Sequence, residues 1–368
     1  MTTENKHNFI DFCKGMAIIM VILVHSAQPF NLIYPWNNVF GILQLGVQIF
    51  FVLSGYTQCH SLNTKKLTFI QFMKNRINRI APNWWGIICC YLILGNLSIL
   101  FFGRNLTGSD LRPRDVFINI LMLNGIVTGD ANNLVVRCGW FIGTIIILYL
   151  LTPSVNWLYY KMDSHFRKIL PLLSLLINII IFLVLRHFCK SWLIENNNFV
   201  YFSFMNQMPC YLTGFVMYDL ISSGIKRNRV IEATAIVSLI VTILSYSFSS
   251  EFSFMLVPFL FSIGFASFFI TLYNHFSSMG SWIKPLIISY GKHSFAIYLT
   301  HIFIVHDCFW LLKKVIEFFR INFYDFKQIF FPCFLILFIP ACYIAGRIFE
   351  TMIGQVLSLI RHITSGSK

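Results

Sequence analysis

The chain has 368 residues, of which 57% are hydrophobic and only 11% are charged. Soluble globular domains carry charged residues at about 25%, so this composition excludes an ordinary soluble fold and predicts a polytopic membrane protein. The formal net charge of +14 is suited to anionic lipid head groups and to anionic cytoplasmic ligands. Because no aromatic-basic nucleic-acid motif is present, we expect membrane lipid as a partner and no nucleic acid.

Ten apolar segments are long enough to cross a membrane as helices. They lie at 10–30, 38–57, 83–102, 139–158, 169–187, 199–220, 230–248, 252–273, 294–312 and 328–349. Most of the 28 lysines and arginines fall on the side of the N-terminus, so the positive-inside rule places both termini in the cytoplasm. The predicted fold is an all-α bundle of about ten transmembrane helices, forming a single domain over residues 1–368. A shorter apolar run, Phe117 to Val127, is predicted to be an external or re-entrant piece that covers the site.

The ten cysteines have no CxxC spacing and no cluster with histidine along the chain. Cys89 and Cys90 are adjacent but lack a partner motif. The sequence therefore predicts neither a metal site nor a disulfide framework. The first apolar run is too long for a cleavable signal peptide and lacks an A-x-A site, so we expect the first helix to be retained.

The first helix carries ionisable residues at both ends of its apolar centre. Asp11 and Lys14 precede the run from Gly15 to Val24, and His25 follows it. On a helix, Lys14 and His25 lie within about 20° of the same face and roughly 16 Å apart, and Asp11 shares that face. Charged groups in a membrane helix face the bundle interior or a wet cavity. Asp11 and Lys14 could instead be an interfacial pair that sets the helix end, whereas an intramembrane histidine indicates a functional site.

The second predicted helix and the loop after it carry two further features. Ser54 and Gly55, near the cytoplasmic end of that helix, could simply mark a helix terminus with a packing glycine. In KNRINRIAP, Arg76 and Arg79 lie one turn apart before a proline. Two guanidinium groups on one face at the membrane edge suit a phosphate ligand; the alternative is that they only supply the positive-inside signal.

Three stretches, KGMAIIMVILVH, FFVLSGY and RINRIAP, together resemble the acyltransferase-3 family of integral membrane acyltransferases. Lys14 and His25 fit its motif of a basic residue, ten residues and a histidine, although the family usually has arginine at the first position. Arg76 and Arg79 fit its R-x-x-R motif.

Two later segments extend the resemblance over nearly the whole chain. Trp140, Tyr149 and Pro153 fit the helix in which the family has a tryptophan, a tyrosine and a proline at these spacings. Some relatives carry glutamate where this chain has Ile145, so no role for an acid is carried over. YGKHSFAIYLTH, which ends at His301, resembles the penultimate-helix motif and adds a second intramembrane histidine.

The resemblance implies transfer of an acyl group, commonly acetyl from acetyl-CoA, to a hydroxyl of a lipid-linked or surface glycan such as O-antigen. Arg76 and Arg79 would hold the donor phosphates in the cytoplasm, with Ser54 beside them. His25 would act as the base for the hydroxyl, or take the acyl group itself as an acyl-imidazole; the sequence leaves both open. Lys14 and Asp11 would shape the donor entrance.

Three residues are expected on the acceptor side or in support of the site. Trp140 offers a face for sugar stacking, or else an interface anchor. Tyr149 and His301 are substrate or supporting groups, and His301 could equally be a structural contact between helices. No metal is expected.

The expected location is the bacterial cytoplasmic (inner) membrane, crossed several times. The alternative function is a polysaccharide flippase, another transporter or a polymerase without acyl transfer. A transporter would typically show broken helices in two corresponding repeats, and no clear repeat is present. Whether the acyl group is acetyl or succinyl stays open at this point.

Overall fold

The computed structural model describes residues 3–65, 67–102, 112–124, 135–190, 197–225, 228–246, 253–278, 280 and 282–365, and all regular secondary structure in these ranges is helical. The long helices are α1 (Thr3–Ala27), α3 (Gly46–Lys65), α4 (Phe69–Phe102), α6 (Trp140–Lys161), α7 (Ser164–Phe188), α10 (Phe204–Ser222), α11 (Arg229–Tyr246), α12 (Ser253–His275), α14 (Ser294–Phe318) and α15 (Phe323–Ser365). The short elements are η1 (Gln28–Phe30), α2 (Trp36–Ile42), η2 (Leu43–Leu45), α5 (Pro113–Ile120), α9 (Asn197–Phe202), η4 (Phe276–Ser278) and α13 (Ile283–Lys292). The predicted all-α fold is confirmed.

Eight helical stretches of the described residues are long and apolar enough to cross a membrane. They are His7–Phe30, Trp36–Lys65, Phe69–Phe101, Trp140–Lys161, Ser164–Phe188, Arg229–Tyr246, Ser253–Tyr273 and Phe326–Thr364. These match eight of the ten predicted spans. The other two are also helical: 199–220 is divided between α9 and α10 at Ser203, and 294–312 lies within α14, where Ser294–His306 is a shorter apolar stretch of the described residues.

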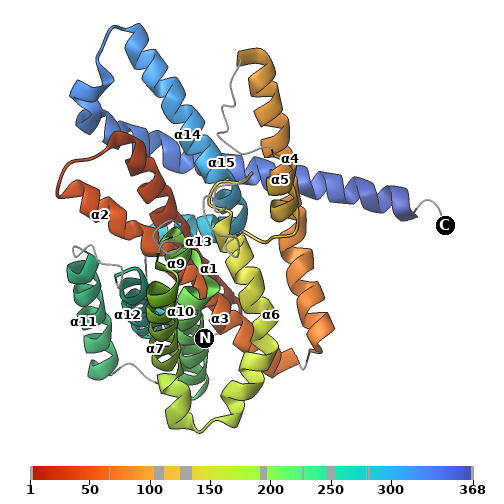
Figure 1. Cartoon of the computed structure of the whole chain (residues 1–368), viewed down its shortest axis with the longest axis vertical. Coiled ribbons are helices and arrows are strands. Elements are labelled where there is room, and N and C mark those ends of the chain that lie inside the picture. Colours follow the sequence, from red (N-terminus) through yellow and green to blue (C-terminus); the bar gives the residue numbers. More distant parts are fainter. Residues whose placement is uncertain are drawn as a thin grey trace.

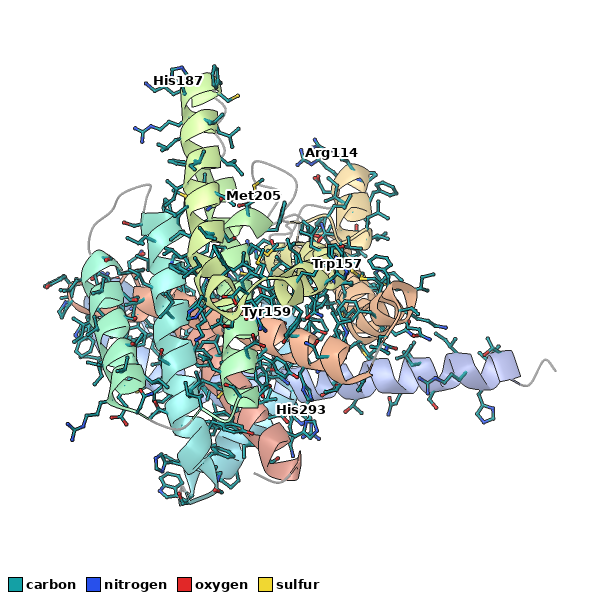
Figure 2. All side chains as sticks on the ribbon, turned by 90° about the horizontal axis from the view of Figure 1, so that it is seen from below. Arg114, Trp157, Tyr159, His187, Met205 and His293 are labelled. Atoms are coloured by element: carbon teal, nitrogen blue, oxygen red, sulfur yellow. The ribbon has the colours of Figure 1, made fainter. Side chains whose placement is uncertain are left out.

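The outer surface of the bundle is suited to lipid. Large apolar side chains such as Ile180 of α7, Ile236 of α11 and Ile336 of α15 are exposed. In water, so much exposed apolar surface would be costly, whereas hydrocarbon accommodates it. Figure 1 shows α15 crossing the bundle and extending beyond it to the C-terminus, and Figure 2 shows α7 projecting from the bundle, with His187 at its free end.

Glycines allow α1 to pack backbone to backbone against α13. A Cβ atom added at Gly15 would lie 2.0 Å from the carbonyl oxygen of Ile287, and one added at Gly291 would lie 1.6 Å from that of Asp11. Neither position could hold a larger residue without moving a helix. This contact fixes the Lys14 end of α1 next to the C-terminal end of α13.

A second glycine pair joins α3 to α10. A Cβ at Gly55 would lie 2.0 Å from the carbonyl oxygen of Tyr211, and one at Gly214 would lie 2.1 Å from that of Val52. The prediction of a packing glycine at Gly55 is therefore confirmed, whereas the prediction of a helix terminus at Ser54 and Gly55 is wrong, because α3 continues to Lys65. Ser54, its neighbour, faces α6 and bonds the hydroxyl of Tyr149.

The predicted loop before the third span is part of a helix. The helix α4 begins at Phe69 and continues through Pro82, so Arg76 and Arg79 lie on helical turns rather than in a loop. Pro82 cannot donate to the carbonyl of Asn78, but Asn78 is exposed and water can hydrate that carbonyl. The helix therefore tolerates the proline.

The apolar run that begins at Phe117 packs against α4 and α6. Trp84 Nε1 donates to the carbonyl of Asn119 over 2.7 Å, and a Cβ at Gly143 would overlap the carbonyl oxygen of Asn124, at 1.3 Å. The part up to Asn124 is a short helix followed by a turn. The rest of the run, 125–127, lies outside the described residues, so its external or re-entrant position stays a prediction.

Candidate active site

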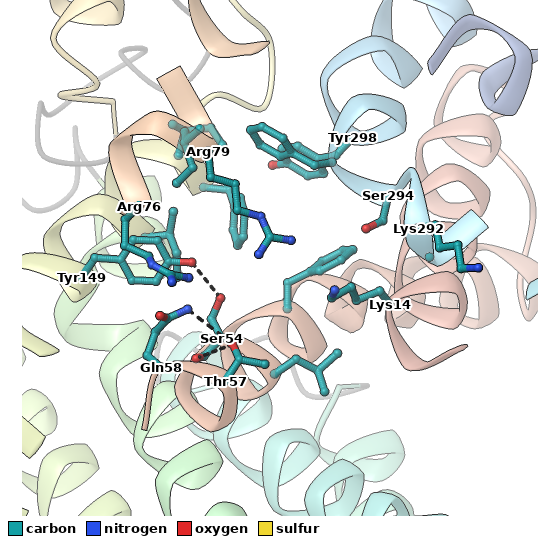
Figure 3. A pocket seen from close by; sticks show the side chains of 18 residues that line it. Lys14, Ser54, Thr57, Gln58, Arg76, Arg79, Tyr149, Lys292, Ser294 and Tyr298 are labelled. Carbon is teal, nitrogen blue, oxygen red and sulfur yellow. Dashed lines mark hydrogen bonds between the residues drawn. The ribbon is translucent and has the colours of Figure 1, made fainter. Parts of the chain in front are cut away.

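An open cavity lies between α1, α3, α4, α6, α13 and α14. Its polar lining, labelled in Figure 3, consists of Lys14, Ser54, Thr57, Gln58, Arg76, Arg79, Tyr149, Lys292, Ser294 and Tyr298. None of the 18 described residues that line it is acidic. Apolar side chains, among them Phe50, Ile80 and Ile142, complete the walls. The cavity therefore combines positive charge with apolar surface, as an anionic ligand with an apolar arm requires.

The two arginines of α4 both reach this cavity from the same side (Figure 3). Arg79 is exposed and Arg76 is half-buried. The Arg76 guanidinium carbon lies 5.5 Å from the centroid of Phe72, and its Nε is buried with no hydrogen-bond partner. A buried N–H donor without an acceptor is unfavourable, so Arg76 is prepared to bind an anion.

Lys14 and Lys292 line the cavity across from the arginines. Lys14 Nζ lies 3.1 Å from Asp11 Oδ1, and both side chains are partly buried. The predicted pair of Asp11 and Lys14 is therefore a real contact, but α1 begins at Thr3, so the pair does not set the helix end. Lys14 also faces the cavity. Asp11 itself is not among the lining residues.

Ser54 and Tyr149 meet on the wall of the cavity. The Ser54 and Tyr149 hydroxyl oxygens lie 3.1 Å apart and share a hydrogen bond between α3 and α6 (Figure 3). Ile145, which stands where some relatives have glutamate, lines the same wall. That wall offers hydroxyl groups and apolar surface but no carboxylate.

His25 lies outside the cavity, at the other end of the apolar centre of α1, and is half-buried. Its Nδ1 lies 3.1 Å from Gln28 Oε1. An amide oxygen only accepts hydrogen bonds, so Nδ1 carries the proton and Nε2 keeps its lone pair. That Nε2 lies 3.7 Å from Cys138 Sγ. Gln28 thus fixes His25 in the tautomer that a proton acceptor needs.

His301 lies next to His25. The centroids of the two rings are 5.1 Å apart, and His301 is fully buried. Its Nδ1 donates to the carbonyl of Tyr298 over 2.6 Å, while its Nε2 has no hydrogen-bond partner. We call His25, Cys138 and His301 the histidine cluster.

Tyr298 links the cavity to the histidine cluster. It lines the cavity, its ring centroid lies 5.4 Å from that of His301, and its hydroxyl donates to the carbonyl of Cys138 over 2.8 Å. The cavity and the cluster are therefore separated by the thickness of one side chain.

Trp140 lies in the core and not in the cavity. It is 6% exposed, and its ring contacts Phe51, Tyr201 and Phe202, the last at 4.6 Å between centroids. The structure thus offers no open face of Trp140 to a sugar. Trp140 is the first residue of the candidate span Trp140–Lys161, so its role as an interface anchor stays a prediction. Its observed role is packing at the start of α6.

Sequence reasoning missed four of the residues that the structure brings together: Gln28, Cys138, Lys292 and Tyr298. Gln28 is three residues after His25 and could have been found by helical spacing. Lys292 and Tyr298 lie within the YGKHSFAIYLTH motif. Cys138 has no signal in the sequence, because its histidine partners come from distant helices.

Comparison with known families identifies the family to which this chain belongs. A family model described as an acyltransferase domain, that of the acyltransferase-3 family, matches residues 7–347. The chain belongs to this family. The match covers nearly the whole chain and confirms the resemblance that the motifs indicate. No curated protein and no solved structure matches this membrane acyltransferase.

Proposed function

We propose that this membrane acyltransferase moves acetyl from acetyl-CoA to a hydroxyl of a surface polysaccharide such as O-antigen. The observation that carries the proposal is the cation-lined cavity whose lining residue Tyr298 contacts His301, the neighbour of His25. The cations suit the phosphates of the donor, and the histidines suit the chemistry at its thioester.

The donor half of the proposal rests on charge. Arg76, Arg79, Lys14 and Lys292 line one cavity with no carboxylate among its described lining residues, and Arg76 Nε lacks an acceptor. Charge-assisted hydrogen bonds from guanidinium to phosphate are among the stronger polar contacts in proteins. The apolar wall around Ile142 and Ile145 suits the pantetheine arm. The excess of basic residues on the N-terminal side of the membrane favours entry from the cytoplasm, where acetyl-CoA is made.

The catalytic half rests on the tautomer of His25. With Nδ1 bonded to Gln28, Nε2 is available to take the proton of an acceptor hydroxyl. The hydroxyl oxygen attacks the thioester carbonyl, the bond from carbonyl carbon to sulfur breaks, and the coenzyme A thiolate takes the proton from His25. The ester and free coenzyme A are the products. His301 supports the ring of His25 from the side.

The location we propose is the cytoplasmic membrane of a bacterium, with the glycan acceptor approaching from the outer side. The eight candidate spans support a multi-pass protein. The donor would then enter at the Lys14 end of the α1 apolar centre and the acceptor at the His25 end, and the two would react beside His25.

Mass spectrometry of the surface polysaccharide with and without this protein tests the proposal. We expect the strain lacking the protein to make the same glycan without its acetate, and a His25→Ala copy to leave the acetate absent. A His187→Ala copy, changed at an exposed histidine on the end of α7, is the matched control and should restore it. Loss of the entire glycan would indicate a flippase or polymerase instead.

A further inference from the structure

The histidine cluster has the geometry of a metal site. Three ligand atoms, His25 Nε2, His301 Nε2 and Cys138 Sγ, lie within 4.8 Å of one another, and the first lies 3.7 Å from Cys138 Sγ. In a tetrahedral zinc site, bonds of about 2.0–2.1 Å to nitrogen and about 2.3 Å to sulfur place neighbouring ligand atoms roughly 3.3–3.6 Å apart. The observed spread therefore needs only small side-chain movements to close around an ion.

Both histidines already present the correct nitrogen. His25 Nδ1 is bonded to the amide oxygen of Gln28, and His301 Nδ1 is bonded to the main-chain carbonyl of Tyr298. Metal-bound histidines typically donate their other ring N–H to a carbonyl or carboxylate, which fixes the tautomer and the ring orientation. The supporting contacts of a metal site are thus present before any ion binds.

His301 supplies an independent observation. The residue is fully buried, and its Nε2 has no hydrogen-bond partner. A buried acceptor without a donor is unfavourable, and here Nε2 lies within 4.8 Å of the ligand atoms of Cys138 and His25. A bound cation would satisfy it.

We propose that His25, His301 and Cys138 bind a single Zn²⁺ ion, with the fourth tetrahedral position left to a small ligand such as water. Two imidazoles and a thiolate favour zinc or another borderline transition ion over Mg²⁺ and Ca²⁺, which prefer oxygen ligands. Binding converts the Cys138 thiol to a thiolate and releases one proton to solvent. The sequence predicts no such site, because its three ligands come from α1, the segment before α6, and α14.

The consequence for activity rests on the proposed function. Coordination occupies the Nε2 lone pair that His25 needs as a base, so zinc in this site inhibits acyl transfer, and a chelator restores it. The ion acts as a reversible inhibitor of the reaction.

Co²⁺ titration of the full-length protein in detergent tests the binding, because Co²⁺ reports its own ligands. We expect one equivalent to produce the near-ultraviolet thiolate-to-cobalt charge-transfer band together with the strong visible bands of a tetrahedral ion, and Zn²⁺ to displace it. Cys138→Ser should lose the charge-transfer band. Cys333→Ser, a change at an exposed cysteine elsewhere, should retain both features. A charge-transfer band that persists in Cys138→Ser, or its absence in the unchanged protein, would overturn the proposal.

A second variant separates ligand loss from misfolding. Cys138→His replaces sulfur with nitrogen, so it should keep tetrahedral visible bands but lose the charge-transfer band. Loss of an outer-shell partner alone weakens metal affinity by roughly 10- to 100-fold. His301→Ala removes a direct ligand and should weaken cobalt binding by at least that factor. Cobalt binding that is unchanged in both variants would rule this cluster out.

The binding measurement contains no acyl donor or acceptor, so its outcome does not depend on the proposed function. If cobalt binds but the glycan carries acetate with or without this protein, only the proposed function fails. If acetylation depends on His25 but no cobalt binds, only the metal site fails. In a working transfer assay, the rate with zinc is divided by the zinc-free rate of the same protein. Zinc should lower this ratio less in Cys138→Ser than in the unchanged protein.

Discussion

The main-chain carbonyl of Tyr298 accepts a 2.6 Å hydrogen bond from Nδ1 of His301. Since the Tyr298 hydroxyl also bonds the carbonyl of Cys138, this one residue of the cavity wall holds two members of the histidine cluster. Any ligand that moves Tyr298 therefore also moves the histidine cluster.

Tyr298→Phe tests this connection. The change removes the hydrogen bond to Cys138 but keeps the ring and the main-chain bond to His301. A net hydrogen bond contributes about 0.5–1.5 kcal/mol, so we expect the turnover number to fall roughly 2- to 10-fold while KM for the donor changes little. Steady-state kinetics of acyl transfer would measure both. A large rise in donor KM with normal turnover would instead place the Tyr298 hydroxyl in donor binding.

His25→Ala is expected to reduce acyl transfer about 10²- to 10⁴-fold, the usual contribution of a general base. His25 is half-buried at the end of α1, so the protein should still insert and purify as a single species. Residual transfer is read from glycan acetate, and size-exclusion profiles confirm folding. Transfer at the normal rate would remove His25 from the chemistry.

Arg76→Lys and Arg79→Lys separate charge from shape in the cavity. Lysine keeps the charge but loses the planar fork. Arg76 is half-buried with an unpaired Nε, whereas Arg79 is exposed, so Arg76→Lys should raise the donor dissociation constant more, by about 10-fold or greater. Calorimetry with acetyl-CoA measures the effect, and Arg361→Lys on the exposed end of α15 serves as the control. If donor affinity is unaltered in both cavity variants, these arginines only orient the protein in the membrane.

Gly291→Ala should destabilise the contact between α1 and α13. The added methyl group would lie 1.6 Å from the Asp11 carbonyl oxygen, and overpacking of this kind costs about 1–3 kcal/mol. Gly354→Ala on α15 is the control, because a Cβ there has no atom within 4 Å. Thermal unfolding in detergent should show a lower midpoint for Gly291→Ala than for the unchanged protein, and an unchanged midpoint for the control. If Gly291→Ala and the unchanged protein had equal midpoints, α1 and α13 would accommodate the added methyl group without loss of stability.

Sidedness can be measured with an impermeant thiol reagent in intact cells after the native cysteines have been replaced. Asn78→Cys, at an exposed position beside Arg79, should be shielded because the charge bias places it inside. Arg114→Cys, at an exposed position on α5, should react. Reversed labelling would put Arg76 and Arg79 on the side without acetyl-CoA and end the proposed transmembrane scheme.

Hydropathy and local spacing predict most of the fold and one half of the site. Apolar runs predict helices well, because each transmembrane helix satisfies its own backbone, and the one-turn spacing of Arg76 and Arg79 holds in α4. Local patterns predict the Lys14 contact with Asp11 as well.

The other half of the site depends on tertiary packing. Cys138 meets His25 only because α1, α6 and α14 converge, and no local pattern encodes that meeting. Trp140 appeared suited to a sugar or an interface, but aromatic residues from α3 and α9 pack against its ring. The third span was predicted to begin after Pro82, yet α4 continues through this proline, one turn after the exposed residue Asn78.

Because α1 is a continuous helix, it fixes the distance between Lys14 and His25. From Lys14 to His25 the helix rises about 16 Å, and α1 has no interruption between these residues. In the proposed reaction, a donor held by its anionic end near Lys14 must carry its acyl carbon across that span. Pantetheine-linked donors are long enough, whereas acetyl phosphate is not. The length of α1 between Lys14 and His25 therefore selects donors by their length. Small activated acyl compounds should bind near Lys14 without their acyl group reaching His25.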